Sequence, residues 1–213
     1  MSDFGQLRSS EPASQPMTFL WRTPEAGSDG LIGTYSRSNT LDRFDFRNGK
    51  HIEFSGTTPV LRFDGRTRDL MAFDCLSNTA APMVSQRMAQ VLHDACPQDI
   101  QLVPARIEAA DGDLDGWSLL NVTATVLAIN HKKSAYTTVP GTQKIMSFRH
   151  LEYLEGCLNE HQLARDAEYL GHLLVSDSLA HTLSGFAGVS FERPQEVYYQ
   201  TMSRRWNSAN DAR

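Results

Sequence analysis

Cysteine is scarce in this 213-residue chain, and an excess of basic residues and long apolar runs are both missing. The three cysteines, Cys75, Cys96 and Cys157, are odd in number, widely spaced and outside any CxxC pair, which excludes a disulfide framework and a zinc knuckle. Twenty Lys and Arg against twenty-five Asp and Glu give a net charge of −5, with no Lys/Arg stripe, so nucleic acid is not an expected partner. No apolar run reaches the ~20 residues of a membrane span, and the first thirty residues do not resemble a secretory signal. The sequence therefore predicts a soluble, cytoplasmic protein with no membrane partner.

The length is sufficient for one domain that needs neither metal nor disulfide, because a chain of this size can bury about 70% of its unfolded surface. Residues 1–16 are polar and rich in serine and proline, which predicts a flexible N-terminal tail. We expect a single α+β domain over 17–200, with a strand-rich part at 17–75 and a helix/strand core at 76–200. Residues 201–213 are expected to form a C-terminal tail.

The predicted fold class is α+β, with a mixed or mostly antiparallel sheet and two short amphipathic helices. Short aromatic segments separated by Gly, Asn and Asp follow residue 17, and Asn48-Gly49 between alternating apolar residues predicts a hairpin. "DIQLVPARI" predicts a strand that Pro104 makes an edge or bulged one. "WSLLNVTATVLAI" is apolar on both faces, which predicts a long central strand.

The two helices are predicted within "APMVSQRMAQVLHDA", with Ser85 as N-cap, and "LLVSDSLAHTLSGFAG", with Ser176 or Asp177 as N-cap. Their segments 83–92 and 174–183 align without gaps and share Val, Ser, Ala and Leu. Duplication of a helix–strand unit explains this likeness, and so does convergence of two capped amphipathic helices. The sequence leaves both explanations open.

"DGDLDGW" places Asp111, Asp113 and Asp115 at alternate positions, as at the start of an EF-hand loop. The twelfth position, which should be a bidentate Glu, is Val122, and the following residues have the composition of a strand. A polar turn between two strands is the better interpretation, and no metal site is predicted.

Catalytic motifs are also missing, since none of the seven histidines has HExxH or HxH spacing and there is neither a P-loop nor GxGxxG. "HLLVSDSLAH" collects His172, Ser176, Asp177 and His181, the residue types of a hydrolytic triad. Their helical spacing and the lack of a GxSxG elbow favour a helix cap instead. The sequence predicts no catalytic or cofactor-binding residue, and a small hydrolase or transferase at this cluster is the alternative.

A series of stretches between about Phe44 and Pro194 has to be considered together, namely "MVSQRMAQVL", "IQLVPARI", "LLNVTATVLAINHKKSAY" and "HLLVSDSLAHTLSGFAGVSFERP". This series resembles a family of bacterial immunity proteins from polymorphic toxin systems, the eleventh catalogued family, formerly a domain of unknown function. The family's Leu-Asn-Val strand, acidic residue and Ser-x-Tyr correspond to residues 120–122, Asn130, Ser134 and Tyr136. The acidic position is an amide here.

The resemblance implies a non-enzymatic antidote that binds and neutralises a cognate toxin domain by direct occlusion. A mildly acidic chain would suit a basic toxin domain. The resemblance then makes Asp111, Asp113, Asp115 and Trp117 candidate toxin-binding residues on one protruding turn. An adaptor of a secretion apparatus is a third possibility, and the oligomeric state is not predicted.

Overall fold

The computed structural model describes residues 17–23, 29–54 and 56–195, and the two predicted tails lie outside this part of the chain. Its helices are α1 (Thr67–Leu70), α2 (Gln86–Ala95) and α3 (Asp177–Leu183), with 3-10 turns at Asp29–Leu31 and Asp45–Arg47. Its strands are β1 (Thr18–Arg22), β2 (Ile32–Tyr35), β3 (Val60–Arg62), β4 (Cys75–Asn78), β5 (Met83–Ser85), β6 (Ile100–Ala109), β7 (Gly112–Val122), β8 (Thr125–Val126), β9 (Ala135–Thr138), β10 (Ile145–His150), β11 (Leu163–Asp166), β12 (Leu173–Ser176) and β13 (Ser190–Glu192).

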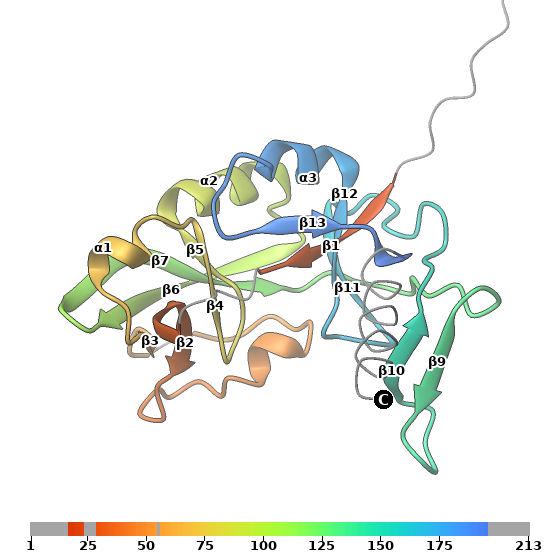
Figure 1. Cartoon of the computed structure of the whole chain (residues 1–213), viewed down its shortest axis with the longest axis horizontal. Helices are drawn as coiled ribbons and strands as arrows, with labels where there is room; N and C mark the ends of the chain where they lie inside the picture. The colour runs from red at the N-terminus through yellow and green to blue at the C-terminus, as the bar shows by residue number, and fades with distance from the viewer. Residues whose placement is uncertain (1–16, 24–28, 55, 196–213) are drawn as a thin grey trace, which may run out of the picture.

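The strands form a closed barrel, an open sheet and a separate hairpin (Figure 1). The barrel has the order β2-β3-β6-β7-β5-β4, the five-stranded sheet has the order β13-β1-β12-β11-β8, and β9 pairs with β10. Parallel and antiparallel pairs both occur, so the predicted strand-rich α+β class is confirmed. Closure of six strands into a barrel was not predicted.

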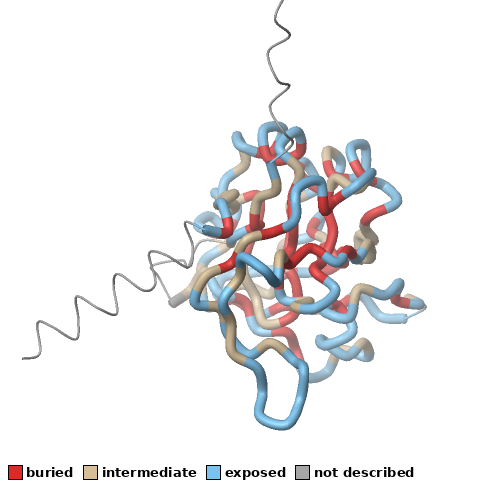
Figure 2. Tube along the Cα trace, turned by 90° about the vertical axis from the view of Figure 1, so that its right-hand side faces the viewer, coloured by how far each residue is buried: buried red, intermediate tan, exposed pale blue. Residues whose placement is uncertain are grey.

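Apolar residues fill the barrel and the space beneath the helices. The buried residues are concentrated in the inner segments of the chain and the exposed ones in its outer loops (Figure 2). Helices α2 and α3 lie side by side over one face and bury Leu92 and Leu183 in a shared cluster with side chains from both sheets. Barrel and sheet therefore share this cluster, although the barrel and the five-stranded sheet also have a further cluster each. Cys75, Cys96 and Cys157 are buried thiols without disulfide partners, as expected.

Three strand predictions need correction. Asn48 ends a 3-10 turn and Gly49 follows with φ +64°, so the expected hairpin is not formed. The reason is tertiary: Phe46 is fully buried, and packing of this side chain overrides the local turn signal. The strand β6 is bulged near Pro104, as one alternative held, but it is not an edge because β3 and β7 flank it. Strand β7 is central between β5 and β6, as predicted, but the single strand expected over 117–129 ends at Val122, and Thr125–Val126 form β8 in the five-stranded sheet.

The barrel and the sheet contain equivalent five-strand units. In one, the order β2-β4-β5-β7-β6 begins with a parallel pair and continues with three antiparallel pairs. The order β8-β11-β12-β1-β13 repeats those directions. The registers also agree, since Val84 pairs with Cys75 where Val175 pairs with Leu163. This agreement beyond the helices favours duplication over convergence, with β1 from the N-terminal segment occupying the place that β7 has in the barrel.

The repeated serines perform the same task in both units. Ser85 Oγ accepts a hydrogen bond from Met88 N, and Ser176 Oγ accepts one from Leu179 N, so each side chain caps its helix. Both main-chain N–H groups bond the carbonyl of the residue preceding the partner strand, Asp74 or Gln162. The predicted caps Ser85 and Ser176 are thus confirmed.

Ser85→Ala is expected to lower the free energy of unfolding by about 1–2 kcal/mol, because one N–H at the start of α2 loses its acceptor. Urea denaturation monitored by circular dichroism measures this difference. Ser184→Ala, which removes an exposed hydroxyl bonded to the His181 carbonyl, is the matched control and should stay within about 0.5 kcal/mol. Equal stabilities of the two variants would contradict the capping role.

Candidate functional site

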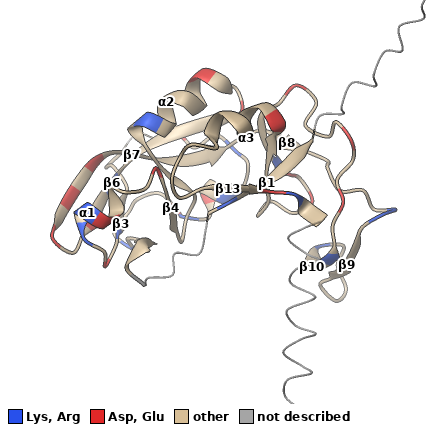
Figure 3. Cartoon of the chain, turned by 45° about the horizontal axis from the view of Figure 1, so that its top comes forward, with Lys and Arg blue, Asp and Glu red and all other residues tan. Residues whose placement is uncertain are grey.

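The hairpin of β6 and β7 carries the predicted toxin-binding residues at its tip. Ala109 pairs with Gly112 across a two-residue turn, so the polar turn predicted from "DGDLDGW" is confirmed. Strand β5 pairs with β7 only at residues 117–119, and among the described residues 112–116 have β6 as their sole strand neighbour. One edge of the hairpin therefore projects past β5, with its acidic residues at the end of the barrel remote from the five-stranded sheet (Figure 3).

The three aspartates are exposed but differ in their contacts. Asp111 Oδ1 accepts the Thr67 main-chain N–H at 2.7 Å, at the start of α1, and this hydrogen bond lowers the pKa of Asp111 below its ordinary value. Asp113 pairs with Arg106 at 3.3 Å. Asp115 forms no ion pair with any residue that the structure describes. Asp115 is thus the carboxylate of the three that is left for a partner.

No group of three or more metal-ligating side chains occurs in the described residues, this turn included. Asp111 serves a helix N-terminus and Asp113 an arginine, so neither carboxylate is directed at a common point. The arrangement gives no support to a calcium loop.

Trp117 is not displayed beside the aspartates, which corrects the picture of an indole on the protruding turn. Its side chain packs in the barrel core and only 7% of the residue is exposed. Gly116, with φ +80°, lies between exposed Asp115 and Trp117 and changes the course of the strand there. Trp117 also lines the hollow described below, so any direct contribution to binding is limited to the small exposed part of the residue.

A hollow of about 570 Å³ runs along the projecting edge of β7, between the hairpin and the start of α2. Met71 and Phe73 give it an apolar side, and Asp115, Arg87 and Gln90 give it polar ones. Met71 is 67% exposed, a large fraction for this apolar side chain. No pattern in the sequence indicates Met71, because the exposure of one apolar residue depends on the fold around it.

Asp74 fixes the floor of this hollow. Its carboxylate accepts Arg87 Nε–H at 3.1 Å, the Ser85 hydroxyl at 2.9 Å and Ala187 N–H at 3.1 Å. Burial alone would raise the pKa of Asp74, but these hydrogen bonds, led by that of Arg87, bring it below its ordinary value. The guanidinium of Arg87 is thereby positioned at the rim, while its charge is largely matched within the chain.

The residues of the alternative catalytic cluster, which lie between His172 and His181, have separate structural roles. Ser176 caps α3 and its hydroxyl bonds Gln162. His172 is buried and its Nδ1 lies 2.8 Å from the Tyr153 hydroxyl, and burial lowers the pKa of His172 to about 4. Asp177 and His181 are exposed on α3. The described residues at this place contain no hydrogen-bonded Ser–His pair of the kind that nucleophilic catalysis requires.

The residues that carry the family resemblance also hold the fold. Buried Asn121 donates its amide to the Lys50 carbonyl at 2.8 Å and to Gln101 Oε1 at 3.0 Å. The Ser134 hydroxyl bonds both the N–H and the carbonyl of Glu152 at 3.0 Å. The side chain of Asn130 accepts Lys132 N–H at 3.2 Å. An amide satisfies this last contact as well as a carboxylate would.

No protein-family model matches the chain, and no curated protein matches it either. None of the described helices combines the length and the apolar character needed to cross a membrane.

Proposed function

We propose that this chain is an immunity protein that binds a cognate bacterial toxin domain in the cytoplasm of the producing cell and blocks it by occlusion. The observation that supports the proposal is the hollow beside the projecting edge of β7, which is lined both by exposed Met71 and by Asp115, a carboxylate without an ion pair among the described residues. An apolar anchor beside a charged rim is a common arrangement in protein interfaces.

The geometry defines how a partner would contact this surface. The main-chain groups of residues 112–116 on the free side of β7 can pair with an extended segment of another chain. Asp115 would attract a basic side chain, and Met71 would be covered by an apolar one. A standard interface of ~1,600 Å² would extend beyond the hollow onto α1 and the exposed face of α2.

The experiment is coexpression of this chain with the C-terminal domain encoded by the adjacent gene, scored by cell survival and by co-purification. We expect survival and a stable complex. Met71→Arg and Asp115→Arg should each weaken the complex by ~30-fold, because one places a charge in an apolar contact and the other reverses the attraction. The control is Glu160→Lys, which also replaces an acidic residue by a basic one but at an exposed position outside the hollow.

Three outcomes count against the proposal. Survival without co-purification would point to an enzymatic antidote rather than occlusion. Binding to components of a secretion apparatus without protection would favour an adaptor. Wild-type affinity in both hollow variants, with an intact complex, would move the interface to another face of the molecule.

A further inference from the structure

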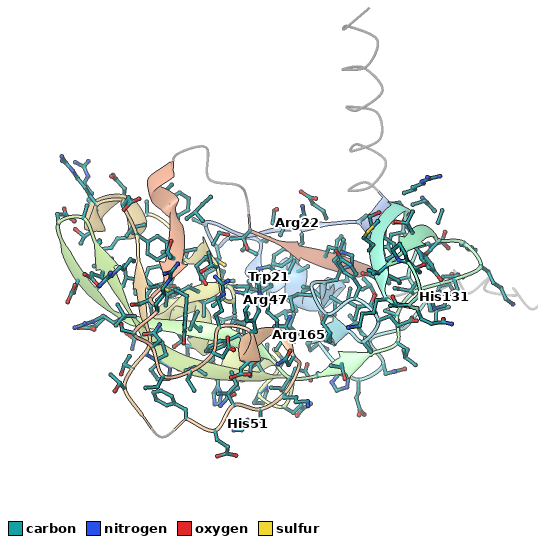
Figure 4. The ribbon with its side chains drawn as sticks, turned by 90° about the horizontal axis from the view of Figure 1, so that it is seen from below. Trp21, Arg22, Arg47, His51, His131 and Arg165 are labelled. Carbon is teal, nitrogen blue, oxygen red and sulfur yellow. The ribbon has the colours of Figure 1, made fainter. Side chains whose placement is uncertain are left out.

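A second cavity, separate from the hollow at β7, lies where the barrel meets the five-stranded sheet and has a volume of about 330 Å³. Trp21 and Arg165 line it from the sheet, Ser77 lines it from β4, and Arg47 reaches it from the segment between β2 and β3. Figure 4 shows Trp21, Arg47 and Arg165 gathered at the centre of the molecule. The volume falls at the lower end of the roughly 300–1,000 Å³ of small-molecule pockets.

Arg165 is a buried cation, with 3% of the residue exposed. Its Nε–H donates to the Val122 carbonyl at 3.0 Å, and its two terminal nitrogens donate to the Leu170 and Phe46 carbonyls at 2.8 and 2.6 Å. A guanidinium has five N–H groups, so two remain for another acceptor. Among the described residues no carboxylate pairs with Arg165. Carbonyl dipoles bind this charge without neutralising it.

Arg47 brings a second positive charge to the same cavity. Its Nε–H and one terminal nitrogen donate to the Ala80 and Thr79 carbonyls at 3.1 and 2.9 Å, which fixes the guanidinium and leaves three N–H groups. Burial lowers the pKa of Arg165 to about 10, and repulsion from Arg47 acts in the same direction. Two like charges held together, one of them out of water, are costly unless an anion is placed between them.

Comparison of the two equivalent units shows that only the unit in the five-stranded sheet has a positive charge at this position. Registers with the neighbouring strands make Arg165 equivalent to Ser77, and Leu173 equivalent to Pro82, and all four residues line the cavity. The position in the barrel unit is thus filled by a small hydroxyl side chain, which leaves room opposite the arginine. The Ser77 hydroxyl makes no hydrogen bond with any described side chain or main-chain group, and it can donate to an oxygen in the cavity.

We propose that this cavity binds the phosphate group of a small molecule, with Arg47 and Arg165 as its cationic ligands and the Ser77 hydroxyl as an additional donor. A dianionic phosphate matches the two guanidinium charges, and both present N–H groups in the planar arrangement that suits phosphate oxygens. The Trp21 ring and Leu173 supply apolar walls for a compact organic body. The site does not depend on the proposed function, because its residues lie outside the hollow at β7.

The test is calorimetric titration of the full chain with inorganic phosphate and, separately, with glucose 6-phosphate, at constant ionic strength set by sodium chloride. We expect saturable binding with one site per chain and an upward shift of the melting temperature, because the ligand binds the folded state. Arg47→Met should weaken binding at least ~10-fold, since one charged donor pair is lost. Arg149→Met, which removes an exposed arginine outside the cavity, is the matched control and should leave affinity unchanged.

Arg47→Met is preferred to a change of Arg165, because Arg165 also donates hydrogen bonds to three main-chain carbonyls. The loss of these bonds would affect folding. Tighter binding of inorganic phosphate would identify the free ion as ligand, and tighter binding of glucose 6-phosphate would identify a phosphomonoester. Both results support the site. The absence of saturable binding by either probe, or equal affinity in Arg47→Met and the wild type, would overturn it.

Discussion

Asp99→Ala is expected to lower the free energy of unfolding by about 3–5 kcal/mol, a large part of the stability of a domain of this size. Asp99 is 1% exposed, and its carboxylate lies 2.6 Å from His161 Nδ1. It also accepts the main-chain N–H groups of Gln162 at 2.8 Å and Leu163 at 3.2 Å. Alanine would leave these buried donors without an acceptor, which costs more than the net value of the hydrogen bonds.

The location of Asp99 explains why this loss would reach the whole molecule. Asp99 precedes β6 of the barrel, while Gln162 directly precedes β11 of the five-stranded sheet and Leu163 is the first residue of β11. The carboxylate therefore connects the two duplicated units at a point where no strand pairing does so. A single cooperative unfolding transition of the wild type depends on such links between units.

Urea denaturation followed by tryptophan fluorescence and by far-ultraviolet circular dichroism would measure this effect. Asp94→Ala is the matched control: Asp94 is exposed, accepts one side-chain hydrogen bond from Gln90, and should change stability by less than about 0.5 kcal/mol. Asp99→Asn, which keeps an acceptor oxygen, should fall between the two. A loss below about 1 kcal/mol in Asp99→Ala would show that the connection is unimportant.

The parts of the fold that the sequence predicted well are those that local chemistry determines. Ser85 and Ser176 stand directly before amphipathic segments, and a hydroxyl at that place satisfies helix N–H groups whatever the tertiary structure. The turn at Asp111 likewise follows from polar residues and Gly112 between two apolar stretches. The alignment of segments 83–92 and 174–183 was visible for the same reason, although each segment starts with a strand, β5 or β12, that was not predicted there.

The rest depends on contacts between residues far apart in the chain. Asn48-Gly49 has the composition of a hairpin turn, but burial of Phe46 and the bonds of Arg47 to the Thr79 and Ala80 carbonyls hold the segment against the barrel. Trp117 is only two residues from exposed Asp115, yet its side chain packs in the barrel core. Sequence spacing indicates which residues alternate along a strand, but not which face a closed barrel will enclose.

The cavity with Arg47 and Arg165 shows this limit most clearly. The two residues are 118 positions apart, counted as 165 minus 47, and neither belongs to a recognisable basic cluster. They meet because the Thr79 and Ala80 carbonyls, just after β4, hold Arg47 beside the cavity that Arg165 of β11 also lines. A repeat in the sequence indicates that two units exist, whereas the chemistry at their junction requires knowledge of how they pack.

Gly188→Ala is expected to lower the melting temperature by ~6–12 °C, equivalent to about 3 kcal/mol for a domain of this length. Gly188 has φ +87°, where L-residues other than glycine are strained, and an added Cβ would lie 2.0 Å from the Cys75 carbonyl oxygen. The backbone at residue 188 or at Cys75 must therefore move. The neighbouring Ala187 carbonyl accepts the N–H groups of Asp74 at 2.8 Å and Cys75 at 3.0 Å, so this movement would separate the segment after α3 from β4.

Differential scanning calorimetry of Gly188→Ala beside Gly185→Ala provides a matched comparison. Gly185 lies three residues earlier in the same segment, where a Cβ would meet nothing within 4 Å, and its replacement should shift the melting temperature by no more than about 1–2 °C. The Ala187 N–H also bonds the Asp74 carboxylate, which positions Arg87. Gly188→Ala should therefore also lower the affinity for any partner that binds at the hollow. Equal melting temperatures for the two variants would show that the close approach of Gly188 to β4 is not maintained in solution.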